Sequence, residues 1–263
     1  MEKVPTLSLQ QGIVYGPVRS RRLGLSLGIN LLPDEVKACS LNCRYCQYSW
    51  TGLLTNSGEQ VRGFLPSRGT VGEAVERAVE EMVRRGTPPD VLTFSGNGEA
   101  TLHPDFPAIV EDLLDIRARL APGCRTAILS NATTVDREEI RKALLRLDDP
   151  VLKLDTGREE TFRRLNAPAP GVRFQAVLDG LRTLGSRIIL QALFVRGSVD
   201  NSTDEEVESW MEAVTFIRPR FVQIYTLDRG PADRGLLPVD AERLRAIATL
   251  LGRRAGVEGR VYG

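Results

Sequence analysis

The sequence is poor in cysteine, histidine and aromatic residues. Its 263 residues contain four cysteines, one histidine and 6% Phe, Trp and Tyr together. Four cysteines are too few for a disulfide scaffold in a chain of this length. A tight group of thiols in a reducing compartment is more typical of metal binding or catalysis. We therefore expect a cytoplasmic protein whose cysteines serve chemistry rather than cross-linking.

Long apolar runs and an excess of charge of one sign are also missing. No stretch approaches the roughly 18 to 20 apolar residues that cross a membrane. The opening residues, MEKVPTLSLQQ, lack the apolar core of a signal peptide. The formal net charge of +1 gives no general reason to expect binding to nucleic acid. We expect neither a membrane nor DNA as a partner.

The sequence does contain enough apolar material for an α/β core, with 42% hydrophobic and 26% charged residues. Apolar residues recur with the i, i+3, i+4 spacing of a helix that packs on a core. This spacing predicts helices in the segments 74–83, 106–120, 140–147, 174–184, 207–217 and 244–251. In the first of them, Thr70 is expected to be the N-cap, with Glu73 completing a capping box.

Short runs rich in β-branched and large apolar residues alternate with the helical segments. They are LSLGINL (25–31), VLTFSG (91–96), RTAILSN (125–131), VLKLD (151–155), RIILQALFV (187–195) and FVQIYTL (221–227). Strands that are separated by helices pair in parallel through right-handed crossovers. The sequence predicts a partial (β/α)6 TIM-like barrel of parallel strands with outer helices. We expect one domain over 1–263, in which segment 1–24 leads into the barrel. The sequence does not decide whether the sheet closes into a complete barrel.

Three of the four cysteines lie in the loop ACSLNCRYCQYSW (38–50), at Cys39, Cys43 and Cys46. Cys124 stands apart, before an apolar run, and is expected to be a buried core residue. Zinc would need a fourth ligand, and structural zinc sites usually use two spaced pairs of ligands, which this chain lacks. Three thiolates suit an iron–sulfur cluster better. They would leave one iron of a [4Fe–4S] cluster without a protein ligand, as a catalytic cluster requires.

The spacing C-x₃-C-x-aromatic-C, here Cys39, Cys43, Tyr45 and Cys46, resembles the signature of the radical S-adenosylmethionine (SAM) enzymes. The resemblance implies that these cysteines hold a [4Fe–4S] cluster whose open iron is chelated by SAM. It further implies that the reduced cluster cleaves SAM to a 5′-deoxyadenosyl radical, which abstracts hydrogen from a substrate. We therefore expect an oxidoreductase- or transferase-type enzyme. Zinc or an unrelated role for the cysteines is the alternative.

The same resemblance implies residues that contact SAM. The turn Gly96-Asn97-Gly98-Glu99 corresponds to the G-G-E turn that receives the amino group of SAM, with Asn97 in place of the usual second glycine. Ser130 and Asn131 end the next predicted strand, where the family contacts the ribose or the carboxylate of SAM. Tyr45 is expected near the adenine. Arg196 and Asn201 come at the carboxyl end of the fifth predicted strand, and Arg196 is expected on the SAM side of the barrel. Each of these is also a common turn, packing or surface residue, so a purely structural role is the alternative.

Polar residues near the carboxyl ends of the later strands are candidates for a substrate pocket. They are Lys153, Asp155, Gln191, Gln223 and Tyr225. In parallel α/β folds ligands bind at this end of the sheet. A desolvated Lys153 could have a lowered pKa and act as a base or as a Schiff-base nucleophile, with Asp155 and Tyr225 as catalytic partners. A buried ion pair between Lys153 and Asp155 is an equally good interpretation.

Longer phrases resemble one group within this family, the wyosine-synthase-like proteins that act on transfer RNA. They are YGPVRSRRLGLSLGINLLP, SGNGEATLHPDF, KLDTGREETFRRLNAP and VQIYTLDRGPA. In that group a second cluster and a Schiff-base lysine are implied. Cys124 alone cannot hold a second cluster, so wyosine synthesis itself is not expected. The resemblance implies a minimal single-cluster member that receives electrons from an external flavodoxin or ferredoxin.

The sequence does not name the substrate, which we expect to be a small molecule, a nucleoside or transfer RNA. An activase that installs a radical on a partner protein is one alternative. A non-catalytic iron–sulfur electron carrier or sensor is another. The basic run Arg19, Arg21 and Arg22 could bind a phosphate or carboxylate, although such runs are more often solvated turns. The loop with Arg229 and Asp233 could form a lid, or only a turn.

Overall fold

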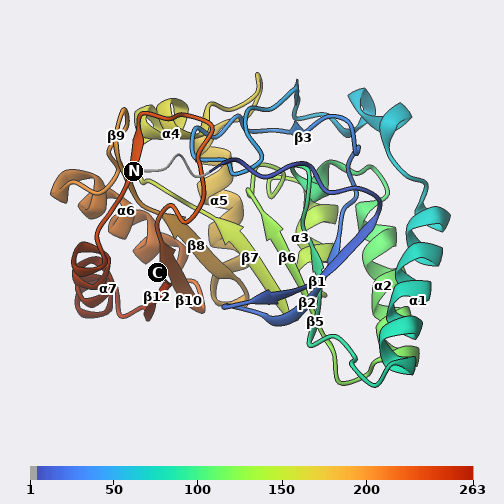
Figure 1. The fold of residues 1–263 in the computed structure, drawn as a ribbon. Helices are drawn as coiled ribbons and strands as arrows, with labels where there is room; N and C mark the ends of the chain where they lie inside the picture. Colours follow the sequence, from blue (N-terminus) through green and yellow to red (C-terminus); the bar gives the residue numbers. More distant parts are fainter. Residues whose placement is uncertain (1–4, 263) are drawn as a thin grey trace.

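The computed structural model describes residues 5–262, and the centre of the molecule is an eight-stranded sheet (Figure 1). The first four residues of the predicted segment 1–24, and residue 263 of the predicted domain, lie outside the described residues. The strand order is β1-β2-β5-β6-β7-β8-β10-β12. The strands are β1 (Val14–Ser20), β2 (Gly24–Ile29), β5 (Val91–Phe94), β6 (Arg125–Ser130), β7 (Asp149–Lys153), β8 (Ile189–Leu193), β10 (Phe221–Tyr225) and β12 (Gly259–Tyr262).

Every pairing from β2 to β12 is parallel, whereas β1 pairs antiparallel with β2 at one edge. Helices between the strands provide the crossovers that parallel pairing needs. The helices are α1 (Arg68–Arg84), α2 (Phe106–Leu120), α3 (Glu138–Leu144), α4 (Glu159–Asn166), α5 (Phe174–Leu184), α6 (Asp204–Ile217) and α7 (Ala241–Ala255). In Figure 1, α1 and α2 flank one end of the sheet, and α6 and α7 flank the other. Within residues 5–262, no helix has the length and apolarity needed to span a membrane.

The predicted fold class is confirmed, with four differences in its elements. Strand β12 extends the parallel run beyond the six predicted strands, and β1 adds an antiparallel edge strand. Both escaped prediction because they are half-exposed edge strands without a continuous apolar run. Helix α4 was missed because it is short and its sequence contains only two large apolar residues, Phe162 and Leu165. The predicted strand 187–195 ends at Leu193, and Val195–Gly197 forms a separate strand, β9, that pairs with β11 (Leu236–Pro238).

The predicted N-cap of the first helix was wrong. Helix α1 begins at Arg68, and the Ser67 side chain caps it by accepting a hydrogen bond of 3.1 Å from the backbone N–H of Thr70. Thr70 therefore lies inside the first turn. The helix begins earlier because Val71 belongs to its buried stripe, and because Arg68 forms an ion pair with Asp112 of α2 at 2.6 Å.

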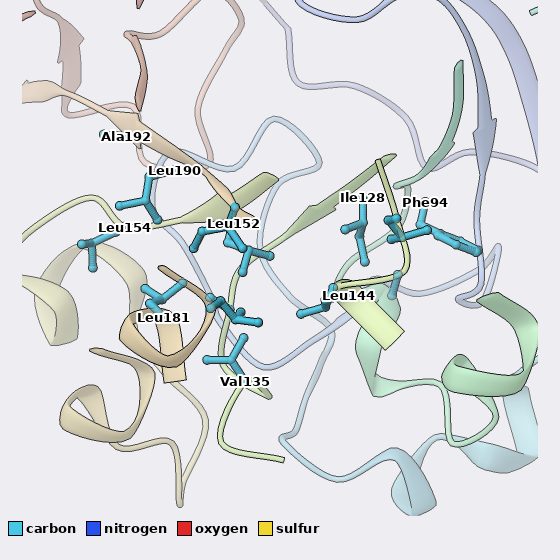
Figure 2. Close-up of a cluster of buried hydrophobic side chains, with 14 of the residues drawn as sticks. Phe94, Ile128, Val135, Leu144, Leu152, Leu154, Leu181, Leu190 and Ala192 are labelled. Atoms are coloured by element: carbon cyan, nitrogen blue, oxygen red, sulfur yellow. The ribbon is translucent and has the colours of Figure 1, made fainter. Parts of the chain in front are cut away.

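Strand residues on the outer face of the sheet form the main apolar core with the helices. Figure 2 shows Ile128, Leu152 and Leu190 from three neighbouring strands gathered with Val135, Leu144 and Leu181. The burial of such side chains stabilises the fold by about 25 cal/mol per Å² of apolar surface. This core fixes the helices on one side of the sheet and leaves the opposite face turned inward.

The inner face changes from apolar to polar along each strand. Near the amino ends, Val151, Ile189 and Phe221 pack together. Because side chains alternate across a strand, the next residues on this face are two positions further along. These are Lys153 on β7, Gln191 on β8, and Gln223 and Tyr225 on β10, and Lys153 and Gln223 are each in register with Gln191. A polar layer therefore lies toward the carboxyl ends of the strands, as the sequence predicted.

Candidate active site

The loop with the three cysteines begins at a short strand, β3 (Ala38–Cys39), which pairs with β4 (Leu53–Leu54). Ala38 also bridges Gly98, after β5. Further along, the Asn42 N–H donates to the carbonyl of Asn166 at 2.9 Å, and the Arg44 N–H donates to that of Leu165 at 3.0 Å. The loop is thus held on one side by the turn after β5 and on the other by the end of α4.

Cys39 and Cys43 are buried, Cys46 is half-buried, and all three are free thiols. Burial, followed by the neighbouring Cys43, raises the pKa of Cys39 to about 12. Burial likewise raises the pKa of Cys43 to about 11. A buried thiolate is costly unless a cation or a metal centre compensates its charge. The site therefore suits thiolates that bind a positively charged inorganic centre.

Two amide side chains are directed at these sulfurs. Asn131 Nδ2 lies 3.4 Å from Cys39 Sγ, and Asn166 Nδ2 lies 3.5 Å from Cys43 Sγ. N–H donors to thiolate sulfur stabilise the charged form and tune iron–sulfur clusters. Among residues 5–262, no three Cys, His, Asp or Glu side chains are placed to hold one metal ion. The N–H donors to Cys39 and Cys43 are the feature of this loop that suits thiolate ligands of a cluster.

Lys37 brings a buried positive charge next to the first cysteine. The residue is 5% exposed, and its Nζ donates to the carbonyl of Ser49 at 2.8 Å. Its charge acts to lower the pKa of Cys39, against the larger effects of burial, Cys43 and Glu99. Lys37 therefore joins the two ends of the cysteine loop and favours the thiolate form.

The turn after β5 needs glycine at two positions. Gly96 and Gly98 have φ values of +141° and +146°, a region that other residues rarely adopt. A Cβ on Gly98 would lie 1.7 Å from the carbonyl oxygen of Ala38, and one on Gly96 would lie 2.5 Å from Asn30 Oδ1. Gly98 thus lets the turn approach the backbone of the cysteine loop, and Gly96 leaves room for the side chain of Asn30.

Glu99 is buried at the end of this turn, and its carboxylate joins two strand ends. Its Oε1 accepts hydrogen bonds from Thr101 and from Ser130 Oγ at 2.9 Å, and its Oε2 accepts from the backbone N–H of Asn131 at 2.6 Å. Burial raises the pKa of Glu99, and these hydrogen bonds act in the opposite direction. Glu99 thereby positions Ser130 and Asn131, the second of which reaches Cys39.

Asn97 holds the N-terminal segment rather than facing the cysteine loop with its side chain. Its Oδ1 accepts from the backbone N–H of Gln10 at 2.7 Å, and its Nδ2 donates to the carbonyls of Gln10 and Pro33. The side-chain amide of Asn97 thus bonds to both the N–H and the carbonyl of Gln10, as the backbone of a neighbouring strand would. These hydrogen bonds explain why asparagine occupies a position at which the G-G-E turn usually has glycine.

Replacing Asn97 by glycine is expected to release Gln10. The change removes one acceptor and one donor that are completely buried, so we expect the free energy of unfolding to fall by about 1–3 kcal/mol. Hydrogen exchange at the amide of Gln10 should become faster. The substitution Asn97→Asp, which keeps the acceptor for that amide, should leave Gln10 better protected than glycine does. Equal exchange rates in all three proteins would contradict this role of Asn97.

Asp155 lies at the centre of a buried hydrogen-bond network that connects the polar layer to the cysteine loop. Lys153 Nζ lies 2.9 Å from Asp155 Oδ1, with the two side chains 13% and 0% exposed. The Oδ1 also accepts from the backbone N–H of Leu193. Asp155 Oδ2 accepts from Tyr45 Oη at 2.6 Å and from Asn166 Nδ2 at 3.0 Å. Since Asn166 also reaches Cys43, one continuous chain of contacts runs from Lys153 to a cysteine sulfur.

Lys153 is therefore an ammonium in an ion pair rather than a neutral amine. Burial alone would lower the pKa of Lys153, but the attraction of Asp155 and the contact with Tyr225 outweigh it and raise the pKa above its ordinary value. This direction is opposite to the lowered pKa that was considered from the sequence. Of the two interpretations left open there, the buried ion pair is the one that the structure contains.

Tyr225 connects Lys153 to the rest of the polar layer. Lys153 Nζ donates to Tyr225 Oη at 2.8 Å, and Tyr225 Oη donates to Gln191 Oε1 at 3.1 Å. The amide of Gln191 in turn donates to Gln223 at 3.1 Å. The ammonium also lies 4.8 Å from the ring centroids of both Tyr45 and Tyr225, which stabilises the cation further.

Residues 36–214 match the family model described as the Radical SAM superfamily. The chain belongs to the radical SAM superfamily. It is 31% identical over 212 residues to the UPF0026 protein slr1464 of Synechocystis sp., covering 80% of this chain and 74% of that protein. It is 30% identical over 235 residues to GTPase Obg of Brachyspira hyodysenteriae, covering 88% of this chain but only 32% of that protein.

Solved radical SAM structures have the same fold. A radical SAM methyltransferase from Sphaerobacter thermophilus superposes with a TM-score of 0.65 at 13% identity, covering 90% of this chain and 65% of that one. A structure of TYW1 with a lysine-pyruvate adduct bound gives a TM-score of 0.56 at 14% identity, covering 87% and 73%. The partial TIM-barrel architecture and the superfamily predicted from the cysteine spacing are thus confirmed. The finer resemblance to the wyosine-synthase-like group stays a prediction.

The radical SAM fold brings most of the predicted site residues into two connected groups. Glu99, Ser130 and Asn131 adjoin Cys39, whereas Tyr45, Lys153, Asp155 and Tyr225 form the network beside Cys43. Arg196 stands apart on β9, where it is exposed and donates to the carbonyl of Pro238. In the predicted lid, Arg229 is exposed, while Asp233 lies 3.0 Å from Arg44 in the cysteine loop.

Two residues of the candidate site were missed by the sequence analysis. Asn166 joins Cys43 to Asp155, and Lys37 joins the ends of the cysteine loop. Asn201, which the sequence analysis named beside Arg196, is buried and binds the backbone of Asp155, Leu193 and Val195. Asn166 is the last residue of the short helix α4, and nothing in the local sequence marks its amide as a contact of a cysteine sulfur. Lys37 immediately precedes the cysteine loop, and its burial could not be inferred from a charged residue in a polar segment.

Replacing Gly98 by alanine is expected to disturb both the fold and the cysteine loop. The new Cβ would collide with a backbone carbonyl, which cannot yield as a flexible side chain can, so we expect the free energy of unfolding to fall by about 3 kcal/mol or more. Gly72→Ala is a matched control, since nothing lies within 4 Å of its Cβ and alanine stabilises a helix interior by about 0.5–1 kcal/mol. Urea unfolding of both variants checks the prediction, which a similar stability for the two would contradict.

Proposed function

We propose that this chain is an enzyme that cleaves SAM reductively at a [4Fe–4S] cluster held by Cys39, Cys43 and Cys46, and directs the resulting radical at a substrate. Membership in the radical SAM superfamily supports SAM-cleaving radical chemistry. The observation that carries the proposal is the cysteine loop itself. It holds buried, free thiols that receive amide N–H groups from Asn131 and Asn166.

The residues around the cysteines would have distinct roles in holding the cluster. When bound, the cluster supplies the electron for the cleavage of SAM. Asn131, Asn166 and Lys37 compensate the negative charge of the thiolates by hydrogen bonds and by a nearby cation. The depth of Cys39 and Cys43 excludes water from the sulfurs, whereas the half-buried Cys46 lies on the more accessible side of the loop.

SAM would lie along the carboxyl ends of β5 and β6. The turn Gly96-Asn97-Gly98 would border SAM there, and Glu99 fixes Ser130 and Asn131 next to Cys39. The carboxylate of Glu99 already accepts several protein hydrogen bonds, so its part in SAM binding would be mainly to position its neighbours. Tyr45 would limit the site on the side of the polar layer. Arg196 would take part only if SAM extends to the edge formed by β9.

The substrate would meet the polar layer formed by Lys153, Asp155 and Tyr225. Because Lys153 is held as an ammonium paired with Asp155, it would donate hydrogen bonds to the substrate, and the hydroxyl of Tyr225 would contact the substrate beside it. A small molecule, a nucleoside or transfer RNA are the substrate classes that the resemblance to wyosine-synthase-like proteins supports. An external flavodoxin or ferredoxin would deliver the electron.

Anaerobic reconstitution with iron and sulfide, followed by dithionite and SAM, tests the proposal. We expect 5′-deoxyadenosine and methionine to form in amounts that depend on both reductant and SAM. A cluster that forms but never cleaves SAM would indicate an electron carrier or sensor instead. A partner protein that acquires a radical in the same assay would indicate an activase.

A further inference from the structure

The hairpin of β1 and β2 carries three arginines near its tip, and the structure separates them. Arg19 is exposed. Arg21 forms an exposed ion pair with Asp228 at 2.9 Å. Arg22 is directed at the polar layer, where its guanidinium carbon lies 4.8 Å from the ring centroid of Tyr225. Only Arg22 therefore reaches the residues proposed to meet the substrate.

Arg22 is half-buried, and one nitrogen of its guanidinium lacks a hydrogen-bond acceptor. Its Nη1 is buried and, among residues 5–262, has no hydrogen-bond partner. Buried N–H groups are nearly always paired, because an unpaired one loses its hydration without compensation. A stack on a tyrosine ring attracts the charge of the guanidinium but does not satisfy N–H groups in its plane. An acceptor is therefore missing from the protein at this atom.

The positive charges of Lys153 and Arg22 near Tyr225 also outnumber the negative charges paired with them. Lys153 is compensated by Asp155 at 2.9 Å. No carboxylate of the described residues lies within 4.0 Å of Arg22, and Gln191 and Gln223 are neutral and bond to each other. One uncompensated positive charge thus remains on the ring of Tyr225. Its Oη connects through Lys153 and Asp155 to Tyr45 and the cysteine loop.

We propose that Arg22 binds an oxyanion, a carboxylate or a phosphate, carried by the substrate. A guanidinium presents paired N–H groups that match two oxygens of such a group. The oxyanion would supply the missing acceptor and the missing negative charge together, and it would orient the substrate along the layer that leads from Tyr225 to the cluster. This assignment rests on the proposed function, because it names a chemical group of the substrate that the proposed enzyme would bind.

A purely structural role for Arg22 predicts the opposite effect on stability. If the stack on Tyr225 only fastens the hairpin to the sheet, Arg22→Met should lower the melting temperature in every buffer. If the site is built for an oxyanion, removal of a half-buried charge whose Nη1 is unpaired should leave the melting temperature unchanged or raise it in a buffer without phosphate or carboxylates. Arg19→Met is the matched control, since it removes the same charge from the exposed side of the same hairpin.

Inorganic phosphate and acetate then serve as probes on the reconstituted protein. We expect one or both to raise the melting temperature of the wild type and of Arg19→Met with saturation, and to leave Arg22→Met unaffected. A response to phosphate alone identifies a phosphate ligand, and a response to acetate alone identifies a carboxylate. The proposal is overturned if the wild type shows no saturable response, if Arg22→Met responds equally, or if Arg22→Met is destabilised without anions. None of these measurements requires SAM cleavage. A negative result would therefore contradict the oxyanion site without contradicting the proposed function.

Discussion

Cys43→Ala is expected to yield protein that retains no iron–sulfur cluster after anaerobic reconstitution and forms no 5′-deoxyadenosine above background. The thiol is 9% exposed and receives the N–H of Asn166, and alanine offers no ligand to replace it. Two remaining thiolates do not hold a cubane that normally has at least three protein ligands. Iron and acid-labile sulfide analysis should therefore show a fall from about four of each per chain to background. Alanine at Cys39 or Cys46 should give the same result.

Cys124→Ala is the control for the cysteine substitutions. Cys124 is also buried, but it lies in the apolar core, and its Sγ donates to the backbone carbonyl of Arg125 at 3.4 Å. Loss of this one buried sulfur should cost about 1 kcal/mol of stability and leave the iron content unchanged. A Cys43→Ala protein that still takes up a full cluster would contradict the assignment of the ligands, and so would a Cys124→Ala protein that loses it.

Asp155→Ala is expected to lower the free energy of unfolding by about 3–5 kcal/mol. The substitution leaves the ammonium of Lys153, whose side chain is 13% exposed, without its counter-charge. It also removes the acceptor of Tyr45, of Asn166 and of the Leu193 N–H. Because Asn166 and Tyr45 belong to the surroundings of Cys43, the yield of reconstituted cluster should fall as well. Urea unfolding and iron analysis measure the two effects.

Lys153→Met should cost less than Asp155→Ala, although it breaks the same ion pair. Asp155 would keep three hydrogen-bond donors, so its carboxylate stays solvated by the protein, and we expect a loss of about 1–3 kcal/mol. The double variant should be more stable than the sum of the single effects predicts, by about 0.5–3 kcal/mol. Additive losses, or a larger loss for Lys153→Met, would show that the two residues are not coupled as the structure indicates.

Features carried by periodicity and by spacing were predictable from the sequence. Leu152 and Leu154 alternate with Lys153 and Asp155, and the structure places the former in the core and the latter in the polar layer. The cysteine spacing predicted the superfamily, which the family model confirms. Both signals are local, because neighbours along the chain determine which face of a strand a residue occupies and how far apart the sulfurs can lie.

What the sequence did not predict depends on contacts between distant segments. The ionisation state of Lys153 is set by Asp155 and Tyr225 together, and Tyr225 is 72 positions away along the chain. Asn166 reaches a sulfur 123 positions away, and Asn97 holds a residue 87 positions away. The tip of the β1–β2 hairpin gives three similar arginines different surroundings, which a basic run alone does not reveal. Such roles follow from topology and not from local pattern.

Electron paramagnetic resonance of the anaerobically reconstituted, dithionite-reduced protein, with and without SAM, tests the central claim most directly. The claim is that the three cysteines hold a [4Fe–4S] cluster with one iron open to SAM. We predict the signal of a reduced [4Fe–4S] cluster whose shape changes on addition of SAM, because SAM becomes a ligand of that iron. A protein that retains zinc instead of iron, or a cluster signal that SAM leaves unchanged, would contradict the claim.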